Sequence, residues 1–142
     1  MSSRGLLAGL LPALLLLAGP LAGCGAGEAS PDLFLVERSG PAPAGRLSMV
    51  VSEEGGLSCN RGPKLMLDDA QIIKARTIAE ELQGPVSHHL DLPANPGSVY
   101  AYRVRNEEGA VSFADNSTAR PKVFDELELF VSTVAQQLCH VD

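Results

Sequence analysis

The sequence predicts an α+β fold, in which two helices pack on one face of a mostly antiparallel sheet of four or five strands. Three observations support this prediction. In each half of the chain, apolar residues recur at every second position in two stretches joined by a turn that contains glycine. Each strand pair is followed by a stretch with apolar residues at helical spacing. The resulting order, ββ(β)αββα, is typical of an antiparallel sheet covered by helices on one side.

The strands of the first half are expected before residue 61. Residues 33–38 form an apolar stretch with strand character, and the loop at 39–45 contains two prolines and two glycines. Apolar and mostly polar positions alternate over residues 47–52, which predicts a second strand. A turn at 53–56 then leads to a short third strand over residues 57–60, so that the second and third strands form a hairpin.

The first helix is expected to begin at Asp68 or Asp69, whose carboxylates can accept hydrogen bonds from the unpaired N–H groups of a helix start. It is expected to end at Gly84-Pro85, because proline lacks an N–H and glycine favours helix ends. Residues 84–97 then read as a loop with three prolines. The apolar positions of this helix are Ile72, Ala75, Ile78 or Ala79, and Leu82.

The second half begins with a strand over residues 99–105. Tyr100, Tyr102 and Val104 belong to one face of this strand, and Arg103 and Arg105 belong to the other. After a turn at 106–109, alternation resumes in a return strand that contains Val111 and Phe113.

The final helix is expected after Asn116-Ser117-Thr118, which can cap it, and Pro121, which suits a first helical turn. Its apolar positions recur at steps of three and four residues. They are Leu127, Val131, Val134, Leu138 and Val141, with Phe124 and Phe130 beside them.

The start of the chain resembles the signal peptide of a bacterial lipoprotein. Arg4 precedes an apolar run over residues 5–21, and the segment ends in Leu21-Ala22-Gly23-Cys24, which is similar to a lipobox. The resemblance implies cleavage before Cys24 and a thioether-linked diacylglycerol on its sulfur. Two acyl chains would hold the protein on the outer face of the cytoplasmic membrane, where a single chain binds only weakly.

Two alternatives to lipidation stay open at this point. A permanent transmembrane helix is disfavoured, because Pro12 and Pro20 interrupt the run and its length falls short of the roughly 20 apolar residues of a typical span. An ordinary cleaved signal peptide near a cysteine is the other alternative. The expected organisation is a signal peptide at 1–23, a lipidated tether at 24–32 and a single domain at 33–142.

With Cys24 lipidated, Cys59 and Cys139 remain, and two cysteines in an oxidising compartment usually pair. The expected disulfide would tie the third strand to the end of the last helix. The rival interpretation, a nucleophilic thiol of Cys139 beside His140, is disfavoured because neighbouring residues rarely present their side chains to one another.

Composition and motif content disfavour nucleic-acid binding and catalysis. The formal charge is −6, and it becomes −7 when residues 1–23, with their single cation, are removed, which disfavours nucleic-acid binding. The sequence contains no Gly-x-Ser-x-Gly motif, His-Glu-x-x-His motif or phosphate-binding glycine loop, so a non-enzymatic role without a cofactor is expected.

The loop after the first helix contains the chain's most suggestive residues for binding. His88 and His89 are adjacent histidines with Asp91 nearby, which is too small a ligand set for a typical zinc site. Leu90 and Leu92 could be apolar anchors for a protein partner on a loop stiffened by prolines. The equal alternative is that both leucines pack the loop onto the core.

Two segments resemble the emfourin-like family of small proteinaceous inhibitors of thermolysin-type metalloproteases. One is Leu35-Val36-Glu37-Arg38-Ser39-Gly40, and the other runs from Leu90-Asp91-Leu92-Pro93 through Pro96-Gly97 to Tyr100-Ala101-Tyr102-Arg103-Val104. The similarity spans most of residues 33–140. It implies a small α+β domain and a secreted metalloprotease as the partner, and it assigns no individual contact residue.

The leading hypothesis is therefore a monomeric, membrane-anchored lipoprotein that binds a protein partner, with protease inhibition as its specific form. One alternative is a small-ligand or metal-binding surface lipoprotein that uses His88 and His89. Another is a structural protein of the cell envelope with no ligand.

Overall fold

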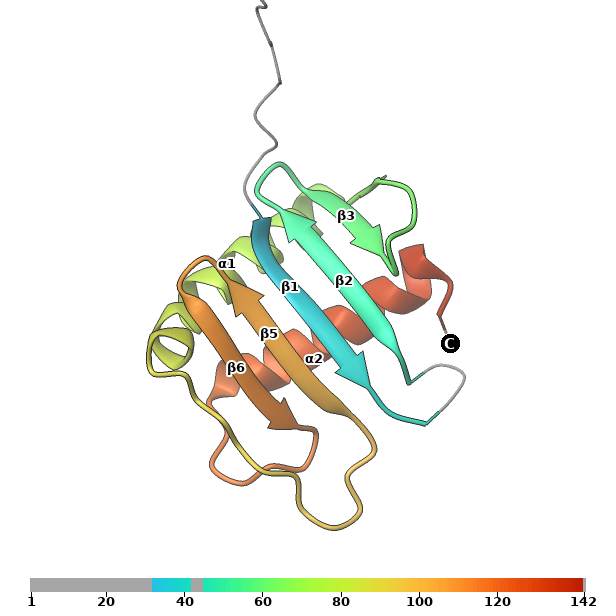
Figure 1. The fold of residues 1–142 in the computed structure, drawn as a ribbon. Helices are drawn as coiled ribbons and strands as arrows, with labels where there is room; N and C mark the ends of the chain where they lie inside the picture. Colours follow the sequence, from blue (N-terminus) through green and yellow to red (C-terminus); the bar gives the residue numbers. More distant parts are fainter. Residues whose placement is uncertain (1–31, 42–44, 142) are drawn as a thin grey trace, which may run out of the picture.

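A six-stranded antiparallel sheet with two helices against one face forms the domain, so the α+β prediction is confirmed (Figure 1). The computed structural model describes residues 32–41 and 45–141. The spatial order of the strands is β4-β3-β2-β1-β5-β6. The strands are β1 (Asp32–Ser39), β2 (Leu47–Ser52), β3 (Gly56–Cys59), β4 (Leu65–Met66), β5 (Ala101–Asn106) and β6 (Gly109–Ala114); the helices are α1 (Asp69–Ser87), α2 (Lys122–Val134) and the π-helical turn η1 (Ala135–Cys139).

The first strand lies at the centre because it pairs with both hairpins. Val36 of β1 is opposite Met49 of β2 on one side and Val104 of β5 on the other. The two hairpins, β2–β3 and β5–β6, extend the sheet outward from this strand. The short edge strand β4 was not predicted, and it raises the strand count to six.

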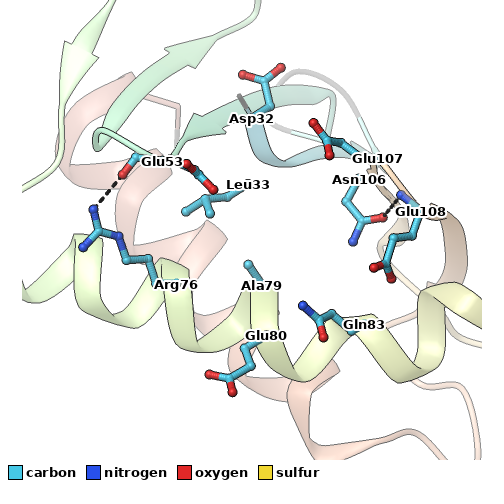
Figure 2. A pocket seen from close by; sticks show the side chains of 10 residues that line it. All are labelled: Asp32, Leu33, Glu53, Arg76, Ala79, Glu80, Gln83, Asn106, Glu107 and Glu108. Atoms are coloured by element: carbon cyan, nitrogen blue, oxygen red, sulfur yellow. Dashed lines mark hydrogen bonds between the residues drawn. The ribbon is translucent and has the colours of Figure 1, made fainter. Parts of the chain in front are cut away.

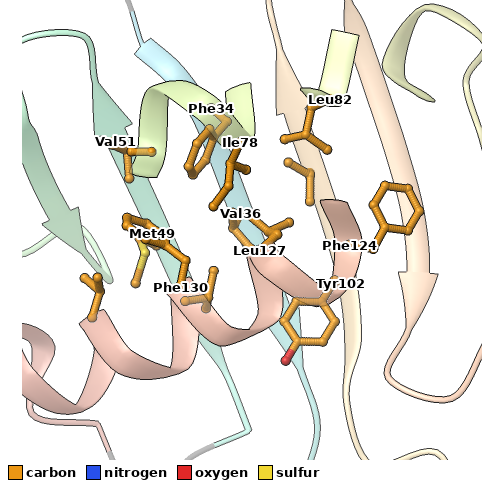
Figure 3. Packing of buried hydrophobic residues seen from close by; sticks show 14 of the residues in the cluster. Phe34, Val36, Met49, Val51, Ile78, Leu82, Tyr102, Phe124, Leu127 and Phe130 are labelled. Carbon is orange, nitrogen blue, oxygen red and sulfur yellow. The ribbon is translucent and has the colours of Figure 1, made fainter. Parts of the chain in front are cut away.

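The core lies between the sheet and the helices (Figure 3). Phe34 of β1 meets Phe130 of α2 edge to face, with ring centroids 6.3 Å apart. Phe113 of β6 stacks between Tyr102 and Phe124, with centroids 5.1 and 4.1 Å away. Helix α1 contributes one buried row, which consists of Ala75, Ile78, Leu82 and Val86.

Helix α1 begins as predicted and ends later than predicted. Asp68 is the N-cap: its carboxylate accepts a hydrogen bond from the Gln71 N–H, and the Gln71 side chain accepts one from the Asp68 N–H. The prediction that Gly84-Pro85 ends the helix is wrong, because the helix continues to Ser87. Val86 is completely buried, and burial of such a side chain gains about 1.5–3 kcal/mol, which offsets the cost of a proline in the last turn.

The expected caps of the final helix are also wrong. Pro121 immediately precedes α2 as its N-cap, and no side chain caps this end. Ser117 instead donates to the Pro93 carbonyl at 2.8 Å and accepts from the Ala114 N–H at 2.9 Å. The side chains of Asn116 and Ser117, which were expected to cap the helix, therefore hold the loop before β5.

Cys59 of β3 and Cys139 at the end of η1 form the predicted disulfide, with 5.8 Å between their Cα atoms. The bond joins the sheet to the far end of the helical layer. Both cysteines also pack against the hydrophobic core.

Candidate functional site

The lipobox-like sequence and Cys24 lie outside the described residues, so the structure says nothing of the anchor. Within residues 32–41 and 45–141, no helix is both long enough and apolar enough to cross a bilayer.

The predicted partner-binding loop follows α1 along the outer edge of β6. The Ser112 N–H donates to the Leu90 carbonyl at 3.0 Å, and the Leu92 N–H donates to the Ser112 carbonyl at 2.8 Å. Leu90 and Leu92 are half-buried and pack against the core. Of the two alternatives weighed from the sequence, packing onto the core is the one that this geometry favours.

The remaining residues of that loop are polar and exposed. Nδ1 of His88 lies 2.7 Å from the Gly84 carbonyl oxygen, and the ring of His89 lies beside Gly109 in the β5–β6 turn. Asp91 is exposed. In the described part of the chain, no three histidine, cysteine or acidic side chains come close enough together to hold a metal ion.

The loop between Pro93 and Val99 is held in place by side chains that follow β6. Asp115 accepts hydrogen bonds from the Ser98 hydroxyl at 2.8 Å and from the N–H groups of Val99 and Tyr100 at 3.0 Å. Burial alone would raise the pKa of Asp115, but these hydrogen bonds outweigh it and lower the pKa below its usual value. The loop is thus fixed in shape before any partner binds.

A hollow of about 320 Å³ lies where β1 begins, between α1 and the two hairpin turns (Figure 2). Its lining is acidic, and its one cation, Arg76, donates to the Glu53 backbone carbonyl at 2.8 Å. The carboxylates that line it belong to Asp32, Glu53, Glu80, Glu107 and Glu108. We call this end of the domain the acidic end.

The opposite end of β1 contains a buried arginine that the sequence analysis overlooked. Arg38 is 7% exposed, and its guanidinium lies 4.9 Å from the centre of the Tyr100 ring, within cation–π range. Arg38 lies on the same buried face of β1 as Phe34 and Val36, and alternation along this strand could have predicted its burial from the sequence. Burial, together with the negative charge of Glu128, raises the pKa of the neighbouring Tyr102 to about 12, although Arg38 opposes the shift.

Among the described residues, no helix covers the face of the sheet opposite α1 and α2 (Figure 1). Its side chains alternate with the core positions of the same strands. We call it the open face and define it by Leu35, Glu37, Val50, Arg103, Arg105 and Ser112.

Register fixes the arrangement of the open face. Leu35 of β1 is opposite Val50 of β2 and Arg105 of β5, so an apolar pair lies beside a cation. Glu37 is opposite Arg103, yet its carboxylate lies 3.6 Å from the Arg105 guanidinium. The sequence had already assigned Arg103 and Arg105 to one face of their strand, but which face stays uncovered follows only from the placement of both helices.

Comparison with known proteins gives no match: no family model matches the chain, and neither does any curated protein or solved structure.

Proposed function

We propose that this protein is an extracytoplasmic lipoprotein, anchored by a diacylglycerol on Cys24, whose domain is a non-catalytic protein-binding module. The observation that supports the binding role best is the open face. Both helices cover the same side of the sheet, and the other side has small, apolar and charged side chains with no helix of the described residues over them. Such a surface suits contact with another protein better than enclosure of a small molecule.

The proposed anchor constrains where that surface lies. Seven residues separate Cys24 from Asp32 at the start of β1, and an extended chain of that length spans at most about 25 Å. The acidic end, which contains Asp32, would therefore lie nearest the bilayer. Its carboxylates would be repelled by anionic lipid headgroups, which would hold the domain off the membrane and leave the open face accessible.

Mass spectrometry of the native protein tests the anchor. We expect a mature chain that begins at Cys24 with the added mass of a diacylglycerol, and we expect a Cys24→Ala variant to leave the membrane fraction. A Cys59→Ser/Cys139→Ser variant is the matched control, because it removes two cysteines and should stay in the membrane fraction. An unmodified residue 24 in membrane-bound native protein would refute this part of the proposal.

Protease inhibition is a second candidate, and the fixed loop between Pro93 and Val99 favours it. A protease inhibitor needs an exposed segment whose shape is set before binding, and Asp115 holds this loop in that way. Val99, which is 49% exposed, is an apolar side chain that a protease cleft could accept. The emfourin-like resemblance points to a thermolysin-type metalloprotease as the target.

Inhibition of thermolysin by the purified full chain is the test of this candidate. We expect a Val99→Asp variant to lose inhibition, and a Leu129→Asp variant, changed at an exposed leucine on α2, to retain it. If thermolysin is not inhibited at micromolar protein, or if both variants lose inhibition alike, the inhibitor candidate is wrong. The broader protein-binding role would still stand.

A further inference from the structure

We propose that the open face binds an acidic polypeptide segment of the partner protein, with Arg103 and Arg105 as its carboxylate-binding residues. The inference rests on the proposed protein-binding role and specifies the chemistry of the partner. It depends on the sign of the charge on the open face, on the side chains between the charges, and on the position of the acidic end.

The open face differs in charge from the chain as a whole. The protein has a formal charge of −6, whereas the open face has two arginines and one carboxylate, Glu37. The hollows at its margin are lined by charges of both signs: the cations Arg46 and Lys64, of which Lys64 lies 3.9 Å from Glu54, and the carboxylates Asp32 and Glu107. The residues that define the open face therefore have a net positive charge in an otherwise acidic protein, and the centre of this face, at Arg103, is complementary to a negatively charged segment of a partner.

The arginines differ in their present contacts. Arg105 lies 3.6 Å from Glu37, and both side chains are about half exposed. No carboxylate of residues 32–41 and 45–141 lies within ion-pair distance of Arg103, whose side chain is exposed. Arg103 therefore has its full set of donors available, and a guanidinium binds a carboxylate through two parallel hydrogen bonds.

Spacing matches the two arginines to an extended acidic segment. Residues two apart on one strand face are separated by about 6.5–7 Å, which is also the spacing of alternate side chains in a partner strand. Leu35 and Val50 provide an apolar strip beside Arg105, against which the uncharged side chains of such a segment can pack. The combination suits a polypeptide with acidic and apolar residues.

An anionic lipid surface fits less well. Asp32 and Glu107 line the hollow at the end of the open face where Leu35 and Arg105 also lie. A flat bilayer laid against the open face would bring its phosphates close to these carboxylates, and like charges in contact cost several kcal/mol. A narrow polypeptide segment centred on Arg103 keeps most of its length away from these carboxylates, because Arg103 lies two residues farther along β5 from them than Arg105 does.

The test uses poly-L-glutamate as the acidic polypeptide and the full chain in a non-ionic detergent at low ionic strength. The central variant is Arg103→Glu, and its matched control is Lys122→Glu. The control reverses one charge on the helical layer, at a side chain that is 87% exposed. Arg103→Lys preserves the positive charge but removes the planar guanidinium, whose parallel N–H groups bind both oxygens of a carboxylate. Both positions are exposed, and the ion pair that Lys122 makes with Glu126 at 2.9 Å is a surface pair of the kind worth about 0–1 kcal/mol. Thermal unfolding should therefore differ little among the variants, and it serves as the check on folding.

We expect Arg103→Glu to weaken binding of poly-L-glutamate by about tenfold or more, since an attraction is replaced by a repulsion. Lys122→Glu should change binding by no more than about twofold, and Arg103→Lys should fall between them. Binding should also weaken with added salt.

Three results with the purified protein would overturn the inference: no measurable binding of poly-L-glutamate, equal effects of the two charge reversals, or tighter Arg103-dependent binding to phosphatidylglycerol vesicles. The last would identify a lipid surface as the occupant. None of these outcomes depends on the lipid at Cys24, so failure of the anchor and failure of the acidic-segment inference are distinguishable. A partner crosslinked in cells through the helical layer would likewise refute the inference and leave the protein-binding role intact.

Discussion

Loss of the disulfide should cost this domain a large part of its stability. The bond joins residues 80 positions apart, from the third strand to the end of the helical layer. In the loop-closure account, a cross-link over this separation reduces the entropy of the unfolded chain by an amount worth about 4 kcal/mol at 25 °C. Domains of this size have total stabilities of about 5–15 kcal/mol, so the bond accounts for a substantial share.

The expected change in melting temperature follows from the size of the domain. Unfolding entropy is about 2.1 cal/mol/K per residue, which gives about 0.23 kcal/mol/K for a domain of about 110 residues. Division of about 4 kcal/mol by this value predicts that a Cys59→Ser/Cys139→Ser variant melts about 15–20 °C below the oxidised protein.

Thermal unfolding followed by circular dichroism measures this change. Reduction of the natural protein should lower its melting temperature by about the same amount as the double substitution, and reductant should leave the variant unaffected. If both treatments shift the melting temperature by less than about 5 °C, equivalent to roughly 1 kcal/mol, the loop-closure reasoning is wrong for this domain.

Three further predictions concern individual side chains. In a Tyr100→Phe variant, Tyr102 is the only tyrosine, and its absorbance should titrate with a midpoint at about 12; a midpoint near 10 would contradict its burial. Because the native pKa of Tyr102 is raised, its contribution to stability is complete below pH 10 and is lost as the pH rises through about 12. Asp115→Ala should lower the free energy of unfolding in urea at neutral pH by about 1.5–3 kcal/mol, the usual worth of hydrogen bonds to a charged group. Because the native pKa of Asp115 is lowered, this difference from the natural protein should shrink as the pH falls below about 4, and an unchanged difference in acid would refute it. Leu127→Ala at a fully buried position should cost about 2–5 kcal/mol, and Leu129→Ala on the exposed side of the same helix should cost no more than about 0.5 kcal/mol; equal effects would contradict the assigned core.

The elements that the sequence predicts well are those whose signal is local and long enough to repeat. The apolar stretch of β1, the alternation over β2 and β5, and an N-cap aspartate at 68 or 69 specify their structure without reference to distant residues. The β4 strand could not be found in this way, because Leu65 and Met66 are too few to show any period, and their pairing with β3 sets the strand.

The mistaken helix ends have a common cause, because tertiary contacts outweighed local preference. Pro85 is tolerated inside α1 because the next residue, Val86, fills the core. Serine is a residue type that often caps helices, but the Ser117 hydroxyl instead donates a hydrogen bond to the Pro93 carbonyl in the loop before β5. Neither outcome can be derived from local preferences alone.

The candidate site was only partly predictable for the same reason. Strand alternation places Arg103 and Arg105 on one side, but their importance depends on both helices packing against the other side. The sequence alone does not show whether Leu90 and Leu92 bind a partner or pack onto the core, because their packing depends on the hydrogen bonds between their loop and β6. The residue types indicate which interactions each surface can make, and the packing of both helices on one face of the sheet determines which surface is accessible.

Site-specific photocrosslinking in intact cells tests the central claim most directly. A crosslinking amino acid is introduced at Ala101 on the exposed side of β5 and, as the matched control, at the exposed Thr77 of α1. We predict a crosslink from position 101 to an acidic segment of a protein partner, weakened by Arg103→Glu, and none from position 77. A crosslink from position 77 alone, or the same products from both positions, would contradict the claim that the open face is the binding surface.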